Sequence, residues 1–205
     1  MAAIRAATVP PAVFLSASAQ GYYGDRGDEA LTEESRPGSD FLADVCVQWE
    51  AEARKAESLT RVVLLRTGIV LAADGGALPR MLLPFRLFAG GPLGSGRQFM
   101  PWIHLDDWAE MAAWALSHEE VRGPVNVGSP TPVRNKDFAA TLGRALGRPS
   151  WAPAPAFALR LAVGEMAGPL LLASTRMLPA RALALGYEFR HPALDRALED
   201  ILHPR

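Results

Sequence analysis

The sequence predicts an α/β fold with a parallel sheet, because a short apolar run, a helical segment and a second apolar run follow one another. The first run is Val13-Phe14-Leu15, which comes after two prolines and is typical of a short buried strand. The second run, RVVLLRTGIVL at residues 61–71, is β-branched and almost continuously apolar, as strands of a parallel sheet are when both faces are covered. Strand, helix and strand in this order form one βαβ unit.

The helix between the two strands is expected over residues 40–56. Asp40 is a candidate N-cap residue. Apolar side chains then recur at four-residue steps, as in an amphipathic helix, and they are Phe41, Val45, Trp49 and Ala53. The glycine-rich residues 21–37 before it are expected to be irregular.

The rest of the chain predicts further helices and one more strand. Residues 75–96 are rich in glycine and proline around the segment MLLPFRLF, which predicts a helix followed by an irregular loop. Asp106 or Asp107 is expected to open a helix to about Ser117, residues 125–127 to form a strand, and Asn135 to cap a helix through Leu146. After the break at residues 147–149, two or three more helices are expected, the last beginning near Pro192.

Composition excludes several classes of function. The chain has 205 residues, 49% of them apolar, and a formal net charge of −1, which argues against a nucleic-acid or anionic-membrane partner. The single cysteine, Cys46, excludes an internal disulfide and a cysteine-based metal site. The four histidines show no metal-ligand spacing, so no metal is expected. Neither a signal-peptide core nor a membrane-spanning run is evident, which favours a cytoplasmic protein.

Several segments resemble one protein family over nearly the whole chain. They include SASAQGYYGD at residues 16–25, GGPLGSGRQFMPWIHLDD at residues 90–107 and the tail from Phe157 to Leu198. These are similar to the extended short-chain dehydrogenases/reductases, and specifically to the atypical branch labelled "epimerase family" (the YfcH-like group). The resemblance implies a partial Rossmann-type parallel sheet with a helical C-terminal lobe on the substrate side.

The resemblance also implies a division of the chain. Residues 1–72 correspond to the late part of an NAD(P)-binding domain, residues 73–150 to a mixed substrate-side lobe with the remaining sheet elements, and residues 151–205 to a family-specific helical domain. The glycine-rich dinucleotide fingerprint that opens this fold is absent. We therefore expect the chain to be the C-terminal part of a longer parent, or to be completed by a separately encoded half. A mis-started reading frame is compatible with either.

The family's cofactor site maps onto two strand ends. The resemblance implies that Ser16, Ser18, Thr67, Gly68 and Val70 contact NAD(P) in a full-length parent. The adenosine and pyrophosphate half is not encoded here, so weak or no NAD(P) binding is expected for this chain alone. The glycine cluster at residues 90–96 follows no predicted strand and is interpreted as structural rather than as a phosphate loop.

The catalytic residues of the family are only partly present. Ser18 is the best match to the serine that hydrogen-bonds the substrate oxygen; on composition alone it is a polar strand end that satisfies loop amides. The tyrosine and lysine that move the proton during hydride transfer are replaced by Leu42 and Cys46. Tyr22 and Arg97 are expected in the substrate cleft, and Tyr22 or Tyr23 is the candidate replacement for the missing tyrosine.

Four positions bear on the substrate and the scaffold. Met100 and Ile69 stand where sugar-nucleotide epimerases have an arginine for the diphosphate and an asparagine for the nucleotide-sugar, which argues against a UDP-sugar substrate. The resemblance implies that His104 orders its loop and caps a helix. Cys46 is interpreted as a packing residue rather than a nucleophile.

Two functions remain open. The first is an epimerase-family protein that is an NAD(P)-dependent oxidoreductase or epimerase when full length and inactive as this chain. The alternative is a non-catalytic module that binds a nucleotide or a partner on the same fold. Substrate and reaction are not determined. Because the strand at residues 13–15 would lack a neighbour, we also expect insolubility, self-association through that sheet edge, or pairing with a separate N-terminal half.

Overall fold

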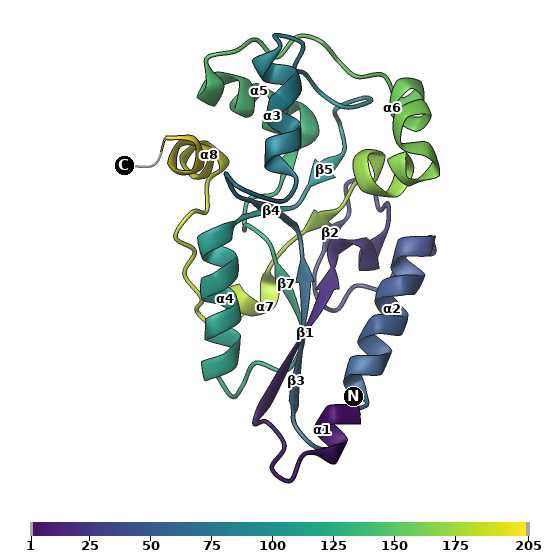
Figure 1. Ribbon diagram of the computed structural model, residues 1–205, viewed down its shortest axis with the longest axis vertical. Helices are drawn as coiled ribbons and strands as arrows, with labels where there is room; N and C mark the ends of the chain where they lie inside the picture. Colours follow the sequence, from purple (N-terminus) through teal and green to yellow (C-terminus); the bar gives the residue numbers. More distant parts are fainter. Residues whose placement is uncertain (1, 204–205) are drawn as a thin grey trace.

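The computed structural model describes residues 2–203 and confirms the predicted α/β fold (Figure 1). Its central sheet is parallel, with the strand order β1 (Val13–Ala19), β3 (Arg61–Thr67) and β7 (Gly123–Val127). Helix α2 (Phe41–Arg54) connects β1 to β3 and completes the predicted βαβ unit. Asp40 caps this helix as predicted, since its carboxylate accepts a hydrogen bond from the backbone N–H of Ala43.

Both faces of β3 are covered, which explains its continuous run of apolar residues. Val62 and Leu64 pack in a cluster with residues of and just after α2. The alternate residues Val63 and Leu65 pack in a second cluster with residues of α4 (Leu105–Ser117). Side chains that alternate along a strand point to opposite faces, so each helix covers one face of the sheet (Figure 1).

The face of α2 that packs on the sheet differs from the one the four-residue pattern indicates. Phe41 and Trp49 are 69% and 50% exposed. The buried residues are Ala43, Cys46, Glu50 and Ala53. Successive steps of four residues drift around a helix by about 40° each, whereas steps of three and four in turn stay on one line. The buried line also contains a glutamate, which a search for apolar side chains does not find.

The second predicted strand is interrupted at Gly68. The chain changes neighbours there: the N–H of Gly68 donates to the carbonyl of Val127, and the next N–H donates to Pro101. A side chain at Gly68 would lie 2.9 Å from the Pro101 carbonyl oxygen, so only glycine fits this close approach. β4 (Ile69–Leu71) therefore pairs with β6 (Trp102–His104) in a separate sheet, and the prediction that Val70 continues the central sheet is wrong.

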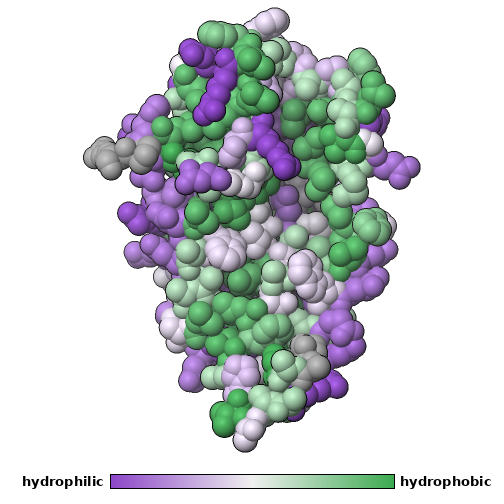
Figure 2. Space-filling model, in the orientation of Figure 1, coloured by the Kyte–Doolittle hydropathy of each residue, from purple (hydrophilic) through white to green (hydrophobic). Residues whose placement is uncertain are grey.

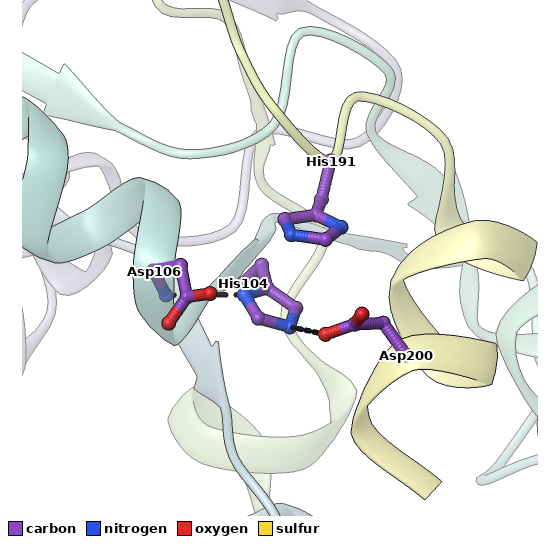
Figure 3. Close-up of side chains that lie close together, drawn as sticks. All are labelled: His104, Asp106, His191 and Asp200. Carbon is purple, nitrogen blue, oxygen red and sulfur yellow. Dashed lines mark hydrogen bonds and ion pairs between the residues drawn. The ribbon is translucent and has the colours of Figure 1, made fainter. Parts of the chain in front are cut away.

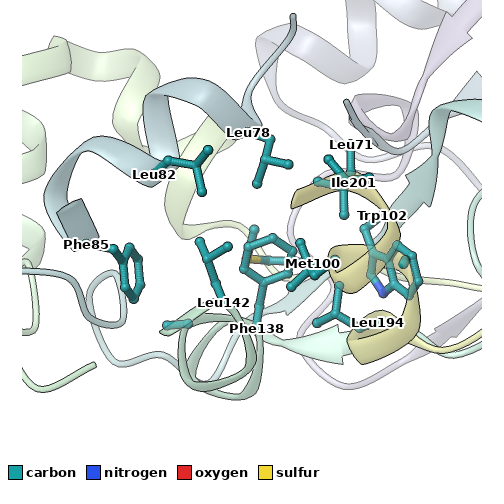
Figure 4. Close-up of a cluster of buried hydrophobic side chains, with 13 residues drawn as sticks. Leu71, Leu78, Leu82, Phe85, Met100, Trp102, Phe138, Leu142, Leu194 and Ile201 are labelled. Carbon is teal, nitrogen blue, oxygen red and sulfur yellow. The ribbon is translucent and has the colours of Figure 1, made fainter. Parts of the chain in front are cut away.

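A second core lies beyond the carboxyl end of the sheet (Figure 4). Helices α3 (Leu78–Arg86), α5 (Asn135–Leu146) and α8 (Leu194–Leu202) surround it. The antiparallel pair β5 (Phe99–Met100) and β8 (Val133–Arg134) adjoins these helices. The predicted helices in residues 75–96 and near the end of the chain are confirmed.

Shorter elements complete the described part of the chain. They are α1 (Ala2–Ala6), η1 (Gln20–Tyr23), β2 (Ala30–Leu31), α6 (Ala156–Val163), η2 (Gly164–Met166), η3 (Gly168–Leu172), β9 (Arg176–Met177) and α7 (Ala180–Ala184). β2 and β9 pair in parallel, which joins the N-terminal third of the chain to its last segment. Within residues 2–203, no helix combines the length and apolar character needed to cross a membrane.

Two predicted helix caps have different outcomes. His104 caps α4 as expected, because its Nδ1 accepts a hydrogen bond from the N–H of Asp106. Asn135 is not the cap of α5: the N-cap position is Arg134, without a side-chain bond. The side-chain Oδ1 of Asn135 accepts instead from the backbone N–H of Leu93, so it ties a loop to the helix.

β1 lies at the edge of the central sheet as the structure describes it. Its residues 13–15 are only half-buried, and they carry apolar side chains without a charged residue among them. An apolar edge strand of this kind is open to pairing with another chain. Association through this edge stays a prediction.

We expect Leu198→Ala to lower the free energy of unfolding by about 2–5 kcal/mol, because Leu198 of α8 is fully buried in the second core. The matched control is Leu183→Ala, at a leucine of α7 that is 48% exposed. Urea unfolding followed by circular dichroism measures both. Equal losses in the two variants would show that the second core does not have the packing described.

Candidate functional site

A cavity of about 380 Å³ opens at the carboxyl ends of β1 and β3, where open α/β sheets bind ligands. Its volume is within the range of small-molecule sites. Its walls come from the end of β1 with η1, from α2, from the β3–β4 junction, from the segment around β5, and from residues 169–175. Of the predicted site residues, Thr67 and Gly68 line this cleft.

The Thr67 hydroxyl is already engaged in hydrogen bonds. Its Oγ1 donates to the carbonyl oxygen of Leu65 at 3.2 Å and accepts from the indole N–H of Trp108 at 3.3 Å. Thr67 therefore shapes the wall between β3 and α4. It offers a ligand contact surface rather than a free hydroxyl group.

The other predicted site residues lie outside the set that lines the cleft: Ser16, Ser18, Tyr22, Val70 and Arg97. Ser18 is buried, and its hydroxyl donates to Oε1 of Glu50 at 2.8 Å. Ser16 makes only a long contact of 3.4 Å to the carbonyl of Ala17. The catalytic role of Ser18 and the cofactor roles of these residues stay predictions.

Leu42 and Cys46 line the cleft from α2, four residues apart. The sequence resemblance assigns these two positions to the tyrosine and lysine of the short-chain dehydrogenases, an assignment that stays a prediction. The Cys46 thiol lies 3.9 Å from the Ala19 carbonyl, and burial raises its pKa, so it stays protonated and neutral. Neither side chain supplies the acid or the fixed positive charge that the proton transfer needs.

A buried ion pair lies beside the cleft. Arg66 of β3 and Glu50 of α2 are 2% and 4% exposed. They bind in the two-point geometry that suits guanidinium and carboxylate, with Nε to Oε1 at 2.8 Å and Nη2 to Oε2 at 2.9 Å. The remaining nitrogen of Arg66 donates to the Tyr23 hydroxyl and to the carbonyl of Glu33.

The two tyrosines after β1 belong to this network. The guanidinium of Arg66 stacks on the ring of Tyr22, 3.4 Å from its centroid. The Tyr23 hydroxyl lies 2.6 Å from Oδ1 of Asn126 on β7. Burial raises the pKa of Tyr23 to about 12, so this phenol is protonated at neutral pH and is unsuited to accept a proton.

Buried polar contacts extend the network to the C-terminal segment. The Glu33 carboxylate accepts from the backbone N–H groups of Asn126 and Arg181. The Asn126 amide donates to the carbonyl of Leu178. The central sheet, the loop after β1 and the segment around α7 are therefore joined by buried hydrogen bonds.

The segment that forms one wall of the cleft is held by a second set of hydrogen bonds. The Thr175 hydroxyl donates to the carbonyl of Gly24, and the Ser174 hydroxyl to the carbonyl of Gly27. The N–H of Ser174 donates to the carboxylate of Asp25. Residues 169–175 are thus fixed against the loop that follows β1.

A group of two histidines and two aspartates lies between α4 and α8 (Figure 3). The rings of His104 and His191 stack with centroids 3.9 Å apart and an interplanar angle of 22°. Asp200 lies 3.4 Å from Nε2 of His104, and Asp106 completes the group. Burial, together with His191, lowers the pKa of His104, which favours its neutral ring.

Two features argue against a metal ion in this group. Nδ1 of His104 accepts a hydrogen bond, so Nε2 carries the proton of the neutral ring and has no lone pair for a metal. Stacked, nearly parallel rings also direct their in-plane lone pairs side by side rather than at one point. We interpret the group as a capping and packing arrangement.

Sequence reasoning missed Arg66, Glu50, Glu33 and Asn126. The sequence did contain one signal. A charged residue inside a buried, apolar strand needs a partner of opposite charge, so Arg66 in RVVLLRTGIVL predicts an acidic residue beside it. The position of the acid on α2 was not available, because it depends on which face of that helix packs on the sheet.

Comparison with known proteins identifies two regions. The family model described as "NAD dependent epimerase/dehydratase family" matches residues 1–128. The model described as "Domain of unknown function (DUF1731)" matches residues 154–201. The epimerase family predicted from the sequence is therefore confirmed, while the YfcH-like branch and the missing N-terminal segment stay predictions.

Two curated relatives are similar over most of this chain. "Epimerase family protein SDR39U1 homolog, chloroplastic" of Arabidopsis thaliana is 45% identical over 94% of this chain and 55% of its own length. "Epimerase family protein SDR39U1" of Homo sapiens is 40% identical over 98% of this chain and 69% of its own length. The chain thus spans a little over half to about two thirds of the length of these relatives.

Solved structures agree on the fold. The crystal structure of human epimerase family protein SDR39U1 (isoform 2) with NADPH is 38% identical, with a TM-score of 0.95 over 100% of this chain and 70% of that chain. A nucleoside-diphosphate sugar epimerase from Corynebacterium glutamicum is 36% identical, with a TM-score of 0.78 over 97% of this chain and 39% of that chain.

We expect Glu50→Ala to lower the free energy of unfolding by about 3–5 kcal/mol, because it leaves the Arg66 guanidinium buried without its counter-charge. The matched control is Glu52→Ala on the same helix, where an exposed pair with Lys55 is lost and a change below about 1 kcal/mol is expected. Urea unfolding measures both. A small effect at Glu50 would contradict the described ion pair.

We expect Tyr23→Phe to change the alkaline limb of the stability curve. The Tyr23 pKa is about 12 in the folded chain, against an ordinary value near 10. The stabilisation of the folded state that comes from this raised pKa is fully present below pH 10. It is lost as the pH rises to about 12, because the unfolded chain releases the Tyr23 proton first. Urea unfolding at pH 9 to 12 should show a loss of roughly 2–3 kcal/mol in the parent that the variant lacks. Parallel curves would contradict the burial of this phenol.

Proposed function

The chain belongs to the NAD dependent epimerase/dehydratase family, and on this basis we propose that its cleft receives the nicotinamide half of a dinucleotide and works without a tyrosine–lysine pair. One observation carries the proposal: Leu42 and Cys46 line the same cleft as Thr67 and Gly68. The cleft lies at the strand ends, where this family binds its ligands. The positions assigned to the proton-transferring tyrosine and lysine hold the alkyl group of Leu42 and the neutral thiol of Cys46.

The cofactor half of the proposal is supported by the location of the cleft and by a relative. Ligands of open α/β sheets bind outside the carboxyl ends of the strands, which is where this cleft opens. The human relative of this chain was crystallised with NADPH. A bound nicotinamide would supply hydride transfer, and Thr67 and Gly68 at the β3–β4 junction are the predicted cofactor residues that would hold it.

The chemical half of the proposal follows from the groups available. Leucine has no transferable proton, and burial keeps the Cys46 thiol neutral. Tyr23 is held as a protonated phenol beside Arg66, and Ser18 donates to Glu50. We therefore propose that the family's usual proton transfer does not occur, and that the 205 residues are inactive in sugar-nucleotide epimerisation by themselves.

A second candidate is a non-catalytic module that binds a nucleotide or a partner in the same cleft. It is favoured by the engagement of the Ser18 hydroxyl with Glu50 at 2.8 Å, which leaves this serine without a free proton donor for a substrate oxygen. An activity assay distinguishes the two candidate functions. Cofactor-dependent turnover that Tyr22→Phe or Tyr23→Phe abolishes would show that a tyrosine transfers the proton, and would contradict both candidates.

We expect the 205-residue chain to bind NADPH and NADP weakly, with a dissociation constant above roughly 100 μM. This corresponds to a binding free energy weaker than about −5.5 kcal/mol. The reason is that the glycine-rich turn which places the pyrophosphate at a helix N-terminus is not among these residues. Isothermal titration calorimetry measures this. Micromolar binding would show that these residues contain a complete dinucleotide site.

We expect reduced nicotinamide mononucleotide to slow the alkylation of Cys46 by N-ethylmaleimide, since both would occupy the cleft. The chain has one cysteine, so mass spectrometry reports on this site alone. Uridine monophosphate, which lacks the nicotinamide ring, serves as the matched ligand control. Equal labelling rates with and without the nicotinamide compound would contradict the proposed site.

A further inference from the structure

Three arginines gather around Phe99, whose side chain lines the cleft. They come from three segments: Arg97 from the loop before β5, Arg134 from β8 and Arg176 from β9. The guanidinium carbons of Arg134 and Arg176 lie 4.3 and 5.4 Å from the centroid of the Phe99 ring. Nη1 of Arg134 also donates to the backbone carbonyl of Arg97. We refer to these three arginines together as the arginine cluster.

Backbone contacts of β5 hold the arginine cluster in place. Phe99 pairs with Arg134 across the antiparallel ladder of β5 and β8. On its other side, the N–H of Phe99 donates to the hydroxyl of Ser174, and its carbonyl accepts from the N–H of Thr175. Arg176 follows directly in the chain. The backbone therefore brings cations of like charge together, an arrangement that favours a bound anion.

One carboxylate of the protein lies within reach of all three arginines. Asp28 forms a two-point ion pair with Arg134, with both contacts at 3.0 Å. The hydrogen bond from Arg134, followed by the charges of Arg134, Arg97 and Arg176, lowers the pKa of the Asp28 carboxyl group. Asp28 thus neutralises Arg134 and leaves the charges of the other two arginines uncompensated.

The neighbouring acids are engaged elsewhere. Glu29 forms an ion pair with Arg26, and the Asp25 carboxylate accepts hydrogen bonds from two backbone N–H groups. Within residues 2–203, the side chains of Arg97 and Arg176 form neither an ion pair nor a hydrogen bond, and both residues are exposed. Two guanidinium groups are therefore available to a ligand, and guanidinium suits carboxylate and phosphate oxygens.

The cleft next to the arginine cluster offers a mainly apolar surface. Met81, Phe99 and Leu170 are among the residues that line it, and Leu170 is 52% exposed. Apolar side chains also gather over the neighbouring helix α6, where Phe157 and Leu161 are 73% and 88% exposed; this surface lies at the upper right of Figure 2. A ligand with an apolar body would bury surface that is otherwise in contact with water.

From this arrangement we propose that the cleft binds an amphipathic small molecule beside the nicotinamide, and that Arg97 and Arg176 bind its anionic group. The apolar body of this ligand lies in the cleft, and its carboxylate or phosphate group lies at the edge of Phe99. The inference deepens the proposed function and rests on it, because it names the class of the second ligand in the same cleft.

The test compares an anionic ligand with a neutral ligand of nearly the same shape, by ligand-observed NMR titration. 2-Naphthoate should bind the 205-residue chain more tightly than 2-naphthamide. Arg97→Gln and Arg176→Gln should each weaken 2-naphthoate about fivefold, as for one partly exposed ion pair, and leave 2-naphthamide unchanged. 2-Naphthyl phosphate is the third ligand, and its affinity relative to 2-naphthoate assigns the anionic group as phosphate or carboxylate.

Two variants serve as controls. Arg122→Gln removes an exposed arginine directly before β7, at the opposite end of the strands from the cleft, and should bind 2-naphthoate as the parent does. Arg176→Lys keeps the positive charge and should retain most of the affinity. Thermal melts followed by circular dichroism establish that each variant is folded.

The location of the ligand is tested separately, through the single cysteine. Cys46 lines the cleft, so 2-naphthoate should slow its alkylation by N-ethylmaleimide in the parent, and less so in Arg176→Gln. Equal affinities of 2-naphthoate and 2-naphthamide, an equal loss of both ligands in the arginine variants, or alkylation that 2-naphthoate does not slow would each overturn the proposal.

Reduced nicotinamide mononucleotide, which carries its own phosphate, separates this proposal from the proposed function. If it binds the parent and both glutamine variants equally while 2-naphthoate is weakened, both proposals are supported. If it does not bind the parent but the effect on 2-naphthoate is found, the proposed function fails and the anion site stands. If the variants weaken the nicotinamide compound and leave 2-naphthoate unchanged, the arginines hold the cofactor phosphate and the present proposal fails.

Discussion

The guanidinium of Arg66 constrains the structure around it, because a charged group that is 2% exposed needs a counter-charge and hydrogen-bond acceptors within reach. Glu50 supplies the charge from α2, while Tyr23 and the carbonyl of Glu33 supply the remaining acceptors. These partners come from separate segments of the chain. Pairs of this kind add little net stability, but arrangements that break them are strongly disfavoured, so the pair specifies how α2 and the loop after β1 meet β3.

The same network determines which groups remain for chemistry at the strand ends. Two hydroxyls near the ends of the strands are bound within the protein: Ser18 donates to Glu50, and Tyr23 donates to Oδ1 of Asn126. On the facing helix, Leu42 and Cys46 contribute apolar surface and a neutral thiol. The lining of the cleft is therefore mainly apolar.

Local elements could be predicted from the sequence more fully than the contacts between them. The βαβ unit and the cap at Asp40 follow from patterns within a few residues, whereas the cap at His104 was implied by the family resemblance. The break at Gly68 does not, because its cause is the carbonyl of Pro101, far away in the sequence. Within the candidate site, Thr67, Gly68 and the replaced positions Leu42 and Cys46 were found by resemblance and do line the cleft.

The wall opposite the sheet depends on contacts that no local pattern encodes. Thr175 reaches the carbonyl of Gly24 across 151 positions of the chain, and its neighbour Ser174 reaches Gly27 across 147. These bonds hold residues 169–173 over the strand ends, where Leu170 and Leu171 face the cleft. Residues 154–201 match a domain of unknown function. Since part of that domain forms the wall, substitutions in it can reshape the cleft while the sheet and its buried ion pair stay as they are.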